Sequence, residues 1–333
     1  MALAVTAIAL SGCGNSSTRG HSSTQRIASG TSRSCNGKHY TVAMVPAVTP
    51  LSFYDTMERA AAAEAQKLCM TIIYQGPATF GADPETQVLD AVLVKHPDAL
   101  VVAPADPSAI QAPIERFEAA GIPVFGIDLA LRDPSVVKSQ VLGNNYQGGQ
   151  LSAAALGTLM HGSGAAAPLN TARGIPTLDL RYQGFAATMH RLYPRIQVLP
   201  QQYAGATPSQ AQTLARDLLL AHPNLKAFFC ITEVQAEGAA AAIAALGKQG
   251  KVFVSTYDGD PTEVQDLKSG KIQFLAVQQV KKEGQTVVDY VHDWLTGKQT
   301  AVPKEVTIDT VAVTKANVDS PQIAPILYGP ASH

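Results

Sequence analysis

The chain has 333 residues, of which 46% are hydrophobic and 15% charged, and its formal net charge is −1. This composition supplies a sizeable core, and the length exceeds that of an average domain, so we expect two lobes. A nearly neutral chain lacks the basic footprint of a nucleic-acid-binding protein, and no apolar run reaches the ~20 residues of a transmembrane helix.

The first 37 residues indicate a leader followed by a tether. Residues 2–10 (ALAVTAIAL) have the length of a signal-peptide core, although no Lys or Arg precedes them. The next residues, LSGC, resemble a bacterial lipobox, whose cysteine, here Cys13, would be lipidated. The Ser-, Thr- and Gly-rich stretch 14–34 predicts a flexible tether, which disfavours the alternative of an ordinary buried cysteine. We therefore expect export and a lipid anchor.

Export changes the interpretation of the other cysteines. Cys35 precedes the first predicted strand and Cys69 ends the first predicted helix, so both fall at the same end of a strand–helix–strand unit. We predict a Cys35–Cys69 disulfide, which an oxidising compartment permits, with two free thiols as the alternative. Cys230 lies in the strand-like run AFFCI and is expected to be an inert core residue.

Short apolar strand-like runs alternate with helical patterns along the chain, which is typical of βαβ units and parallel sheets. Strands are predicted at 40–46, 71–74, 99–103, 123–127, 139–142, 196–199, 226–231, 251–256, 272–277 and 305–311. Helices are predicted at 53–68, 84–95, 108–120, 146–160, 180–192, 208–221, 233–248, 262–269 and 281–296.

Several helix starts carry an N-cap oxygen immediately before a proline. These pairs are Asp83-Pro84, Asp106-Pro107, Thr207-Pro208 and Asp260-Pro261. Capping boxes are predicted for Thr207 with Gln210, Thr232 with Gln235 and Asp260 with Glu263. Asp106 and Thr232 are therefore expected to have structural rather than ligand-binding roles.

In parallel α/β sheets, ligands bind beyond the carboxyl ends of the strands. The segments that follow the predicted strands carry two adjacent aromatic residues and many acids and amides. They are 50–56, 103–108, 127–133, 171–185, 231–238, 255–261 and 277–284. Rings that stack on C–H faces, together with carboxylates and amides that bind hydroxyls, suit a polyhydroxylated ligand.

Four motifs, in this order and spacing, resemble type I periplasmic solute-binding proteins of ABC importers, the ribose-binding and autoinducer-2-binding class. They are DALVVAPADPSAI with EAAGIPVFGID (98–128), GNNYQGGQL (143–151), VSTYDGDP (254–261) and SGKIQFLAVQQ (269–279). The resemblance covers about residues 38–312. It implies an α/β fold of two Rossmann-like lobes joined by a three-stranded hinge, with the solute in the cleft between them. The implied lobes are residues 38–144 plus 279–309 and residues 145–278 plus 310–333.

The resemblance also implies a set of ligand-binding residues. Phe53 and Tyr54 match the aromatic pair that stacks on the sugar, and Asp128 and Asp258 match the acids of the "(I/L)D" and "(F/Y)DG" motifs. Gln278 matches a glutamine near the hinge. The other residues carried over are Asn145 at the first lobe crossing, Asp179 and Arg181 in LDLRY, and Glu233.

Each of these residues has a structural alternative. Asp128 could be a solvated loop acid, and Asp258 could serve a tight Asp-Gly turn. Gln278 and Asn145 could form hinge hydrogen bonds. The remaining alternatives are a mutual Asp179–Arg181 pair and, for Glu233, a favourable acid in the first turn of a helix.

The chain departs from the ribose-type pattern at several of these positions. Ribose types carry an Arg at position 179, where this chain has an Asp, and an Asn and an Asp where it has Thr232 and Glu233. The asparagine before the "PxD" segment is Ala103 here. The solute class implied is therefore a sugar, a sugar alcohol or a related polyol rather than ribose itself.

Phe53 and Tyr54 are adjacent, so on a helix they point about 100° apart and are not expected to enter the same core. Phe53 shares a face with Met57, which favours packing, whereas Tyr54 lies next to Glu58, which favours polar surroundings. We therefore expect Tyr54 to be the ring that meets the ligand.

The function expected is an extracytoplasmic binding subunit that captures a sugar or polyol and delivers it to an ABC permease in the membrane, as a monomer. No cofactor, metal site or catalytic constellation is expected, because the eight His residues are scattered and no GxSxG or phosphate-loop motif occurs. The main alternative is a sensory receptor component that presents a sugar-like signal to a kinase or chemoreceptor. A sugar-sensing repressor and an enzyme on the same fold are further alternatives.

Overall fold

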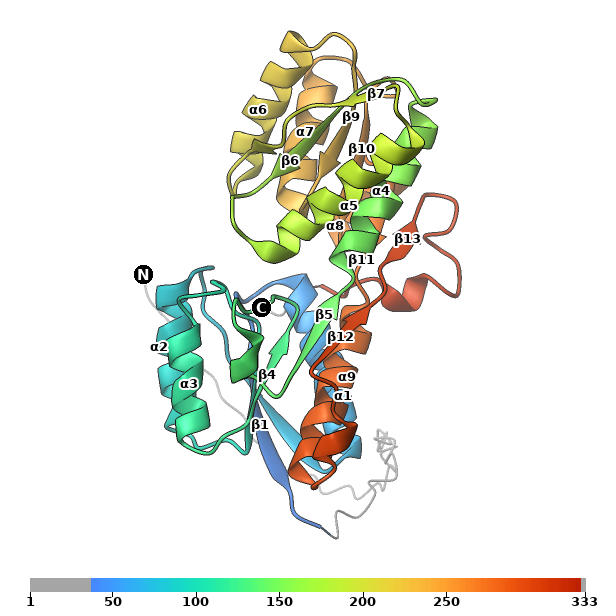
Figure 1. Cartoon of the computed structure of the whole chain (residues 1–333). Helices are drawn as coiled ribbons and strands as arrows, with labels where there is room; N and C mark the ends of the chain where they lie inside the picture. The colour runs from blue at the N-terminus through green and yellow to red at the C-terminus, as the bar shows by residue number, and fades with distance from the viewer. Residues whose placement is uncertain (1–36, 331–333) are drawn as a thin grey trace, which may run out of the picture. The chain divides into compact units, whose positions relative to one another are not determined.

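The computed structural model describes residues 37–330. Cys13, the predicted tether and Cys35 therefore lie outside the described residues. The described strands form two sheets, and each sheet with its helices is called a lobe below (Figure 1).

The first lobe is built on a parallel sheet in the order β12-β5-β4-β3-β1-β2. Helices α1 and α9 cover one face, and α2 and α3 cover the other (Figure 1). The strands are β1 (Tyr40–Val45), β2 (Met70–Tyr74), β3 (Ala99–Val102), β4 (Val124–Ile127), β5 (Ser139–Gly143) and β12 (Glu305–Ile308). The helices are α1 (Ser52–Lys67), α2 (Ala82–Leu93), α3 (Gln111–Ala119) and α9 (Val280–Leu295), with a short 3₁₀ turn η1 (Pro134–Val136) and another, η2 (Gln299–Ala301).

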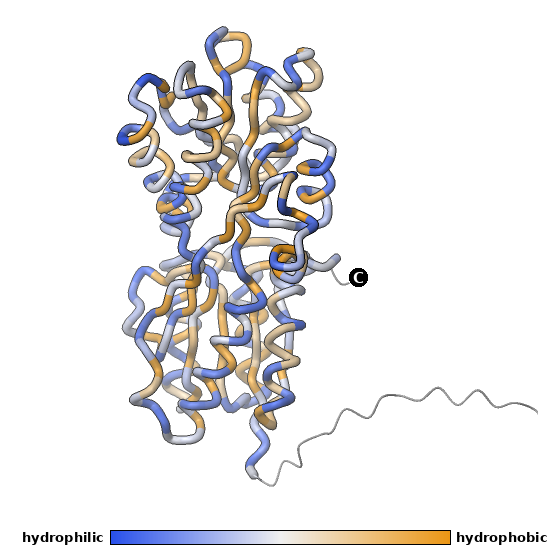
Figure 2. The backbone as a smooth tube through the Cα atoms, turned by 90° about the vertical axis from the view of Figure 1, so that its right-hand side faces the viewer, coloured by the Kyte–Doolittle hydropathy of each residue, from blue (hydrophilic) through white to orange (hydrophobic). Residues whose placement is uncertain are grey.

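Strand β1 shows why this sheet is apolar on both faces. Successive side chains of a strand point to opposite faces, and here Val42 and Met44 join the cluster beneath α1, while Ala43 and Val45 join the cluster beneath α2 and α3. All four are buried, as expected where helices cover both faces of a parallel sheet. Figure 2 shows the hydrophobic positions gathered along the strands.

The second lobe is built on a sheet in the order β13-β11-β10-β9-β6-β7, in which β13 is antiparallel to β11 and β8 pairs with β6. Helix α4 packs against α5, and α6 packs against α7. The strands are β6 (Gly164–Asn170), β7 (Ile196–Val198), β8 (Gln202–Tyr203), β9 (Leu225–Cys230), β10 (Phe253–Tyr257), β11 (Phe274–Val277) and β13 (Val311–Val313). The helices are α4 (Asn145–Leu159), α5 (Pro176–Leu192), α6 (Pro208–Ala221), α7 (Glu233–Ala245) and α8 (Pro261–Ser269), and a 3₁₀ turn η3 (Ala324–Ile326) follows near the end of the chain.

Within residues 37–330, the chain passes between the two sheets at three places: from β5 to α4, from β11 to α9, and from β12 to β13. Hydrogen bonds from side chains connect these three passages. The Asn144 amide donates to Asp309 Oδ1 at 3.0 Å, and the Gln279 amide donates to the Asp309 carbonyl at 2.8 Å. The predicted α/β fold of two lobes with parallel sheets is confirmed. The exact lobe boundaries stay a prediction.

All nine predicted helices occur in the described residues, but strands β6 and β8 of the second lobe were not predicted, and one predicted strand is divided between the two sheets. Strand β6 has the sequence GAAAPLN, whose Ala, Gly and Pro residues favour a strand weakly. Pro168 is tolerated inside the sheet because β7 pairs with residues 164–166 and β8 with residues 169–170, which leaves the proline between the two ladders. The strand predicted over 305–311 is two strands, one in each sheet.

The predicted caps had mixed outcomes. Asp260 forms a complete capping box with Glu263, as predicted. Thr207 accepts from the backbone N–H of Gln210, which is only half of the predicted box, because the Gln210 amide oxygen accepts from the Thr207 hydroxyl instead of from its backbone N–H. Thr232 accepts no such bond from the helix backbone, and its hydroxyl donates to Gln235 Oε1 at 2.5 Å. Helix α2 begins at Ala82, before the predicted cap Asp83. The Asp106 carboxylate accepts from the Ser108 and Ala109 N–H groups in a turn that precedes α3.

The two described cysteines differ in state. Cys69, between α1 and β2, is disulfide-bonded. Its predicted partner Cys35 lies outside the described residues, so the pairing itself stays a prediction. Cys230 is a free, fully buried thiol in β9, as expected for a core residue.

Candidate functional site

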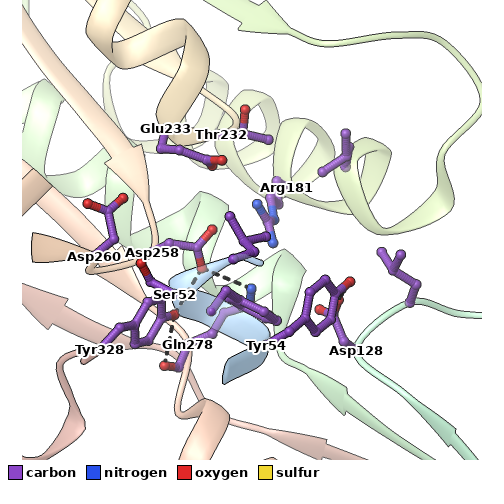
Figure 3. A pocket seen from close by; sticks show the side chains of 14 residues that line it. Ser52, Tyr54, Asp128, Arg181, Thr232, Glu233, Asp258, Asp260, Gln278 and Tyr328 are labelled. Atoms are coloured by element: carbon purple, nitrogen blue, oxygen red, sulfur yellow. Dashed lines mark hydrogen bonds between the residues drawn. The ribbon is translucent and has the colours of Figure 1, made fainter. Parts of the chain in front are cut away.

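A cavity of about 150 Å³ lies where segments of both lobes meet (Figure 3). Its walls come from the start of α1, the loops after β4, β9 and β10, helix α5, the passage after β11 and the C-terminal segment. The lining residues are Leu51, Ser52, Phe53, Tyr54, Asp128, Leu129, Leu178, Arg181, Thr232, Glu233, Asp258, Asp260, Gln278 and Tyr328. The volume holds on the order of ten water-sized groups, which is the number of non-hydrogen atoms in one small monosaccharide.

Most of the predicted site residues meet at this cavity. Those that line it are Phe53, Tyr54, Asp128, Arg181, Glu233, Asp258 and Gln278. Asn145 and Asp179 do not line it. Asp179 is two positions from Arg181 on α5, and about 100° per residue places their side chains on opposite faces of that helix. Asn145 is buried behind Arg181.

The aspartates Asp128 and Asp258 hold corresponding places in the two sheets. Each follows directly on a strand, β4 or β10, and each donates its backbone N–H to the neighbouring strand, to Val141 and Ala276 respectively. Both have a positive φ, 61° and 77°, which is uncommon outside glycine but tolerated by aspartate. The left-handed turn ends each strand and places the carboxylate at the cavity.

On the first lobe, Asp128 is nearly fully buried and accepts a hydrogen bond of 2.7 Å from the Tyr54 hydroxyl. Burial raises the pKa of Asp128 to about 7, which the bond from Tyr54 and the charge of Arg181 partly oppose. The side chain can therefore accept a hydrogen bond from a hydroxyl as a carboxylate or donate one as an acid.

The two rings of α1 correct one expectation. Phe53 and Tyr54 lie edge to face with centroids 5.0 Å apart, and both belong to the same hydrophobic cluster while both line the cavity. The expectation that only one ring could enter the core was wrong. It treated α1 as a helix with one buried face, whereas its first turn is enclosed on several sides, by Asp128 and by Tyr328.

On the second lobe, Asp258 Oδ1 accepts from the Gln278 amide at 3.1 Å and from the Tyr328 hydroxyl at 3.0 Å (Figure 3). Burial raises the pKa of Asp258, while the charge of Arg181 and these two bonds lower it. Burial also raises the pKa of Glu233, the first residue of α7, to about 7, with the charge of Asp258 adding to the effect.

Arg181 is the one cation among the lining residues. Its Nε donates to Asn145 Oδ1 at 2.7 Å and its Nη1 donates to the Ile231 carbonyl at 2.8 Å. The guanidinium lies over the ring of Tyr257, 3.8 Å from the centroid. Among residues 37–330 it forms no ion pair with Asp179, so that alternative fails. Asn145 and Tyr257 fix the plane of the guanidinium, and Arg181 carries the lining's positive charge.

Sequence reasoning missed several lining residues, above all Tyr328. It lies in ILYGP, after the last strand, where no strand end or helix start marks a site. Leu51, Ser52, Leu129 and Leu178 were missed because they are neighbours of the matched residues in the chain rather than parts of a motif. Thr232 and Asp260 were predicted as caps only, yet they also line the cavity.

The arrangement offers rings, acceptors and one fixed cation to a small ligand. Within the described residues, no group of three His, Cys, Asp or Glu side chains is arranged to hold a metal ion. Over the same part of the chain, no helix combines the length and apolar character needed to cross a membrane.

Comparison with known proteins identifies similar chains. The ribose import binding protein of Bacillus subtilis is 26% identical over 268 residues, which are 80% of this chain and 86% of that protein. The D-apiose import binding protein of Actinobacillus succinogenes is 26% identical over 236 residues, covering 71% and 76% respectively. An ABC transporter solute-binding protein from Agrobacterium vitis, solved with bound α-D-tagatopyranose, superposes with a TM-score of 0.82 at 28% identity, covering 87% of this chain and all of that one.

The resemblance inferred from the motifs is confirmed, because the chain matches a protein domain family over most of its length. Residues 42–299 match the periplasmic binding protein domain, which is well over half of the chain. The chain therefore belongs to the periplasmic binding protein family.

Proposed function

We propose that this protein is the extracytoplasmic solute-binding subunit of an ABC importer, which captures a sugar or polyol between its lobes and delivers it to a membrane permease. The observation that carries the proposal is the cavity, where three aromatic rings, several carboxyl groups and one guanidinium surround a space of about 150 Å³. Two similar proteins are named as a ribose import binding protein and a D-apiose import binding protein, and the Agrobacterium vitis protein was solved with bound α-D-tagatopyranose. These similarities support the proposal.

The lining suits a monosaccharide in its chemistry. Phe53 and Tyr54 offer ring faces and edges to the C–H groups of a sugar, and Asp128 and Asp258 offer carboxylate oxygens to its hydroxyls. Arg181 donates from a fixed position to a ring or hydroxyl oxygen.

Binding should favour closure of the lobes. A solute that touches Asp128 on the first lobe and Asp258 and Arg181 on the second gains contacts only when both lobes surround it, so it shifts the population toward the closed form. The boundaries proposed for these moving lobes are residues 38–144 plus 279–309 and residues 145–278 plus 310–333. We also propose binding without turnover, a monomeric state, and anchoring to the cell envelope through a lipid on Cys13.

Titration calorimetry with pentoses, hexoses, tetritols and pentitols tests the proposal. We expect saturable one-to-one binding of at least one compound, and recovery of that compound unchanged after overnight incubation. Asp128→Asn should weaken the binding about tenfold or more, because a hydrogen bond to a charged group is lost. The matched control Asp217→Asn changes an exposed acid on α6 and should leave it unchanged. Failure of every compound to bind would contradict the proposal.

A further inference from the structure

The C-terminal segment 324–330 lies beyond the family match, which ends at residue 299, yet its Tyr328 lines the cavity. This part of the wall is therefore not among the features that the matched family domain supplies. The segment follows β13 and the turns after it, and it returns to the region where both lobes meet.

Hydrogen bonds hold the segment to elements of both lobes. The Tyr328 N–H donates to the Gly259 carbonyl at 3.0 Å, just after β10 of the second lobe. The next N–H, of Gly329, donates to Thr56 Oγ1 at 2.9 Å, in α1 of the first lobe. The Lys281 ammonium at the start of α9 donates to the Leu327 carbonyl at 3.1 Å. These bonds fix the backbone on both sides of Tyr328.

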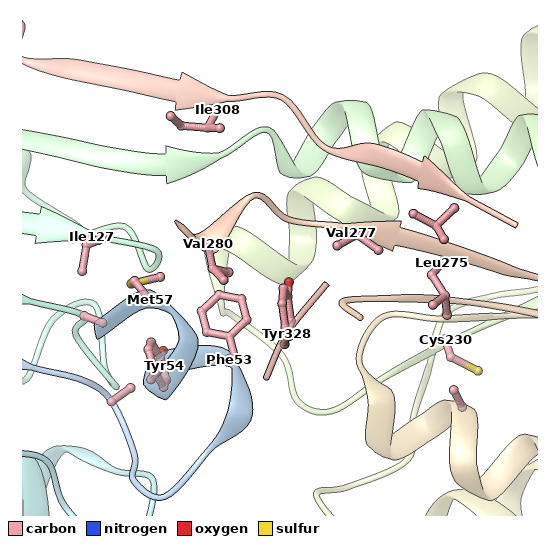
Figure 4. Packing of buried hydrophobic residues seen from close by; sticks show 14 of the residues in the cluster. Phe53, Tyr54, Met57, Ile127, Cys230, Leu275, Val277, Val280, Ile308 and Tyr328 are labelled. Atoms are coloured by element: carbon pink, nitrogen blue, oxygen red, sulfur yellow. The ribbon is translucent and has the colours of Figure 1, made fainter. Parts of the chain in front are cut away.

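The Tyr328 ring extends the aromatic side of the cavity. It is only 6% exposed and lies edge to face with Phe53, with centroids 5.6 Å apart, and Phe53 in turn meets Tyr54 in the same way. Figure 4 shows the Tyr328 and Phe53 rings next to each other within the hydrophobic cluster. The three rings occupy volume that a larger solute would need.

The Tyr328 hydroxyl fixes the acid of the second lobe. It lies 3.0 Å from Asp258 Oδ1 and 3.2 Å from the Gln278 carbonyl, and its single proton can be donated to either. Asp258 Oδ1 also accepts from the Gln278 amide, whereas Asp258 Oδ2 accepts no hydrogen bond from residues 37–330. The carboxylate is therefore held with one oxygen engaged and the other available to a solute hydroxyl.

We propose that the C-terminal segment is a wall of the binding site, and that Tyr328 determines which solutes fit: its ring limits their size and its hydroxyl orients Asp258. This inference rests on the proposed function and adds a specificity element that the family match does not contain. Burial and the nearby Asp258 raise the pKa of Tyr328, so the hydroxyl keeps its proton as a donor over the working pH range.

Two variants separate the roles of the ring and the hydroxyl. Tyr328→Phe keeps the ring and should weaken the binding of every solute by a similar factor, about three- to tenfold, because one neutral-to-charged hydrogen bond is lost. Tyr328→Ala removes the ring. It should change the ratio of affinities by about tenfold or more in favour of solutes with an extra carbon, because the vacated space accepts them. Titration calorimetry over the pentose and hexose series measures both.

The control is Tyr203→Phe, which removes a hydroxyl in the second lobe away from the cavity and should leave all affinities unchanged. If Tyr328→Ala does not fold, Tyr328→Leu keeps an apolar side chain with a smaller volume and serves the same purpose. Unchanged ratios in a folded variant, when the wild-type protein binds a sugar, overturn this inference and leave the proposed function standing. A wild-type protein that binds nothing in the series overturns both.

Discussion

The hydroxyl of Tyr54 donates a hydrogen bond of 2.7 Å to Asp128 Oδ2, and both side chains are almost completely buried. The bond joins the first turn of α1 to the left-handed residue that ends β4, which are 74 positions apart in the chain. The bond engages Oδ2 of Asp128, so Oδ1 is the oxygen to which a solute hydroxyl could donate. Tyr54 thus acts in the proposed site both as a ring and as the partner that orients an acid.

Tyr54→Phe tests this second role. The variant keeps the ring but leaves Asp128 Oδ2 without its donor, so we expect the affinity for the bound solute to fall about three- to thirtyfold. Tyr74→Phe is the matched control, because Tyr74 donates to Asp55 at 3.0 Å but does not line the cavity. Calorimetry that finds equal affinities for wild type and Tyr54→Phe would show that the hydroxyl has no part in binding.

Arg181 and Asn145 should act on the solute as a unit. Asn145→Ala removes the acceptor for the Arg181 Nε proton without touching the cavity, and the guanidinium then loses one of the three contacts that fix its position. We expect Asn145→Ala and Arg181→Met each to weaken binding. The loss of binding free energy in the double variant should be smaller than the sum of the losses in the two single variants. The coupling should be about 0.5–3 kcal/mol, as for residues in contact. Changes in binding free energy that simply add in the double variant would contradict a positioning role for Asn145.

The parts of the site that the sequence predicts well are those tied to strand ends. Asp128 and Asp258 each follow a buried apolar run, and ligands bind beyond the carboxyl ends of parallel strands, so the pattern predicts that each acid lies at the ligand-binding edge of its own sheet. That the two edges face one cavity was implied only by the family resemblance, because the two strands belong to different sheets. Asp179, which was carried over from the resemblance, does not line the cavity. Helix α5 begins at Pro176 rather than at the predicted residue 180, so the sequence pattern did not show which face of the helix Asp179 occupies.

Tyr328 illustrates what local patterns cannot supply. Its place depends on the path of the chain after β13 and on contacts with Gly259, Thr56 and Phe53, which are 69 or more positions away in the sequence. The paired burial of Phe53 and Tyr54 was missed for the same reason. A helix-periodicity argument assumes one buried side, and the chain that encloses the other side arrives from the far end of the sequence.

The contact between α4 and α5 depends on two glycines. A Cβ added at Gly149 would lie 2.0 Å from the Arg181 carbonyl, and one added at Gly184 would lie 2.0 Å from the Tyr146 carbonyl. Gly184→Ala should therefore lower the free energy of unfolding by about 1–3 kcal/mol or more, because backbone must shift to make room. Leu180→Ala, at an exposed position of the same helix, should change it by at most about 0.5 kcal/mol. Urea unfolding measures both, and equal midpoints for the two variants would refute the close packing.

Glu85 of α2 should make stability depend on pH. The side chain is fully buried, Oε2 accepts from the Ala105 N–H at 2.7 Å, and Oε1 has no partner among the described residues. Burial raises its pKa from 4.5 to about 8, so between these values the folded protein holds a proton that the unfolded chain has lost. The contribution of Glu85 to the free energy of unfolding is therefore fully present below about pH 4.5 and is lost as the pH rises to about 8. The loss is at most about 1.4 kcal/mol per pH unit.

Glu85→Gln removes this titration while keeping an oxygen that accepts from Ala105. The variant should lose less stability than the wild type between pH 5 and pH 8.5, so that the difference between their free energies of unfolding changes steadily across this range. Other buried acids, such as Glu283, titrate in both proteins and cancel in the difference. Urea unfolding at intervals of half a pH unit measures it. Parallel curves for the two proteins would mean that Glu85 is already ionised in the fold at pH 5.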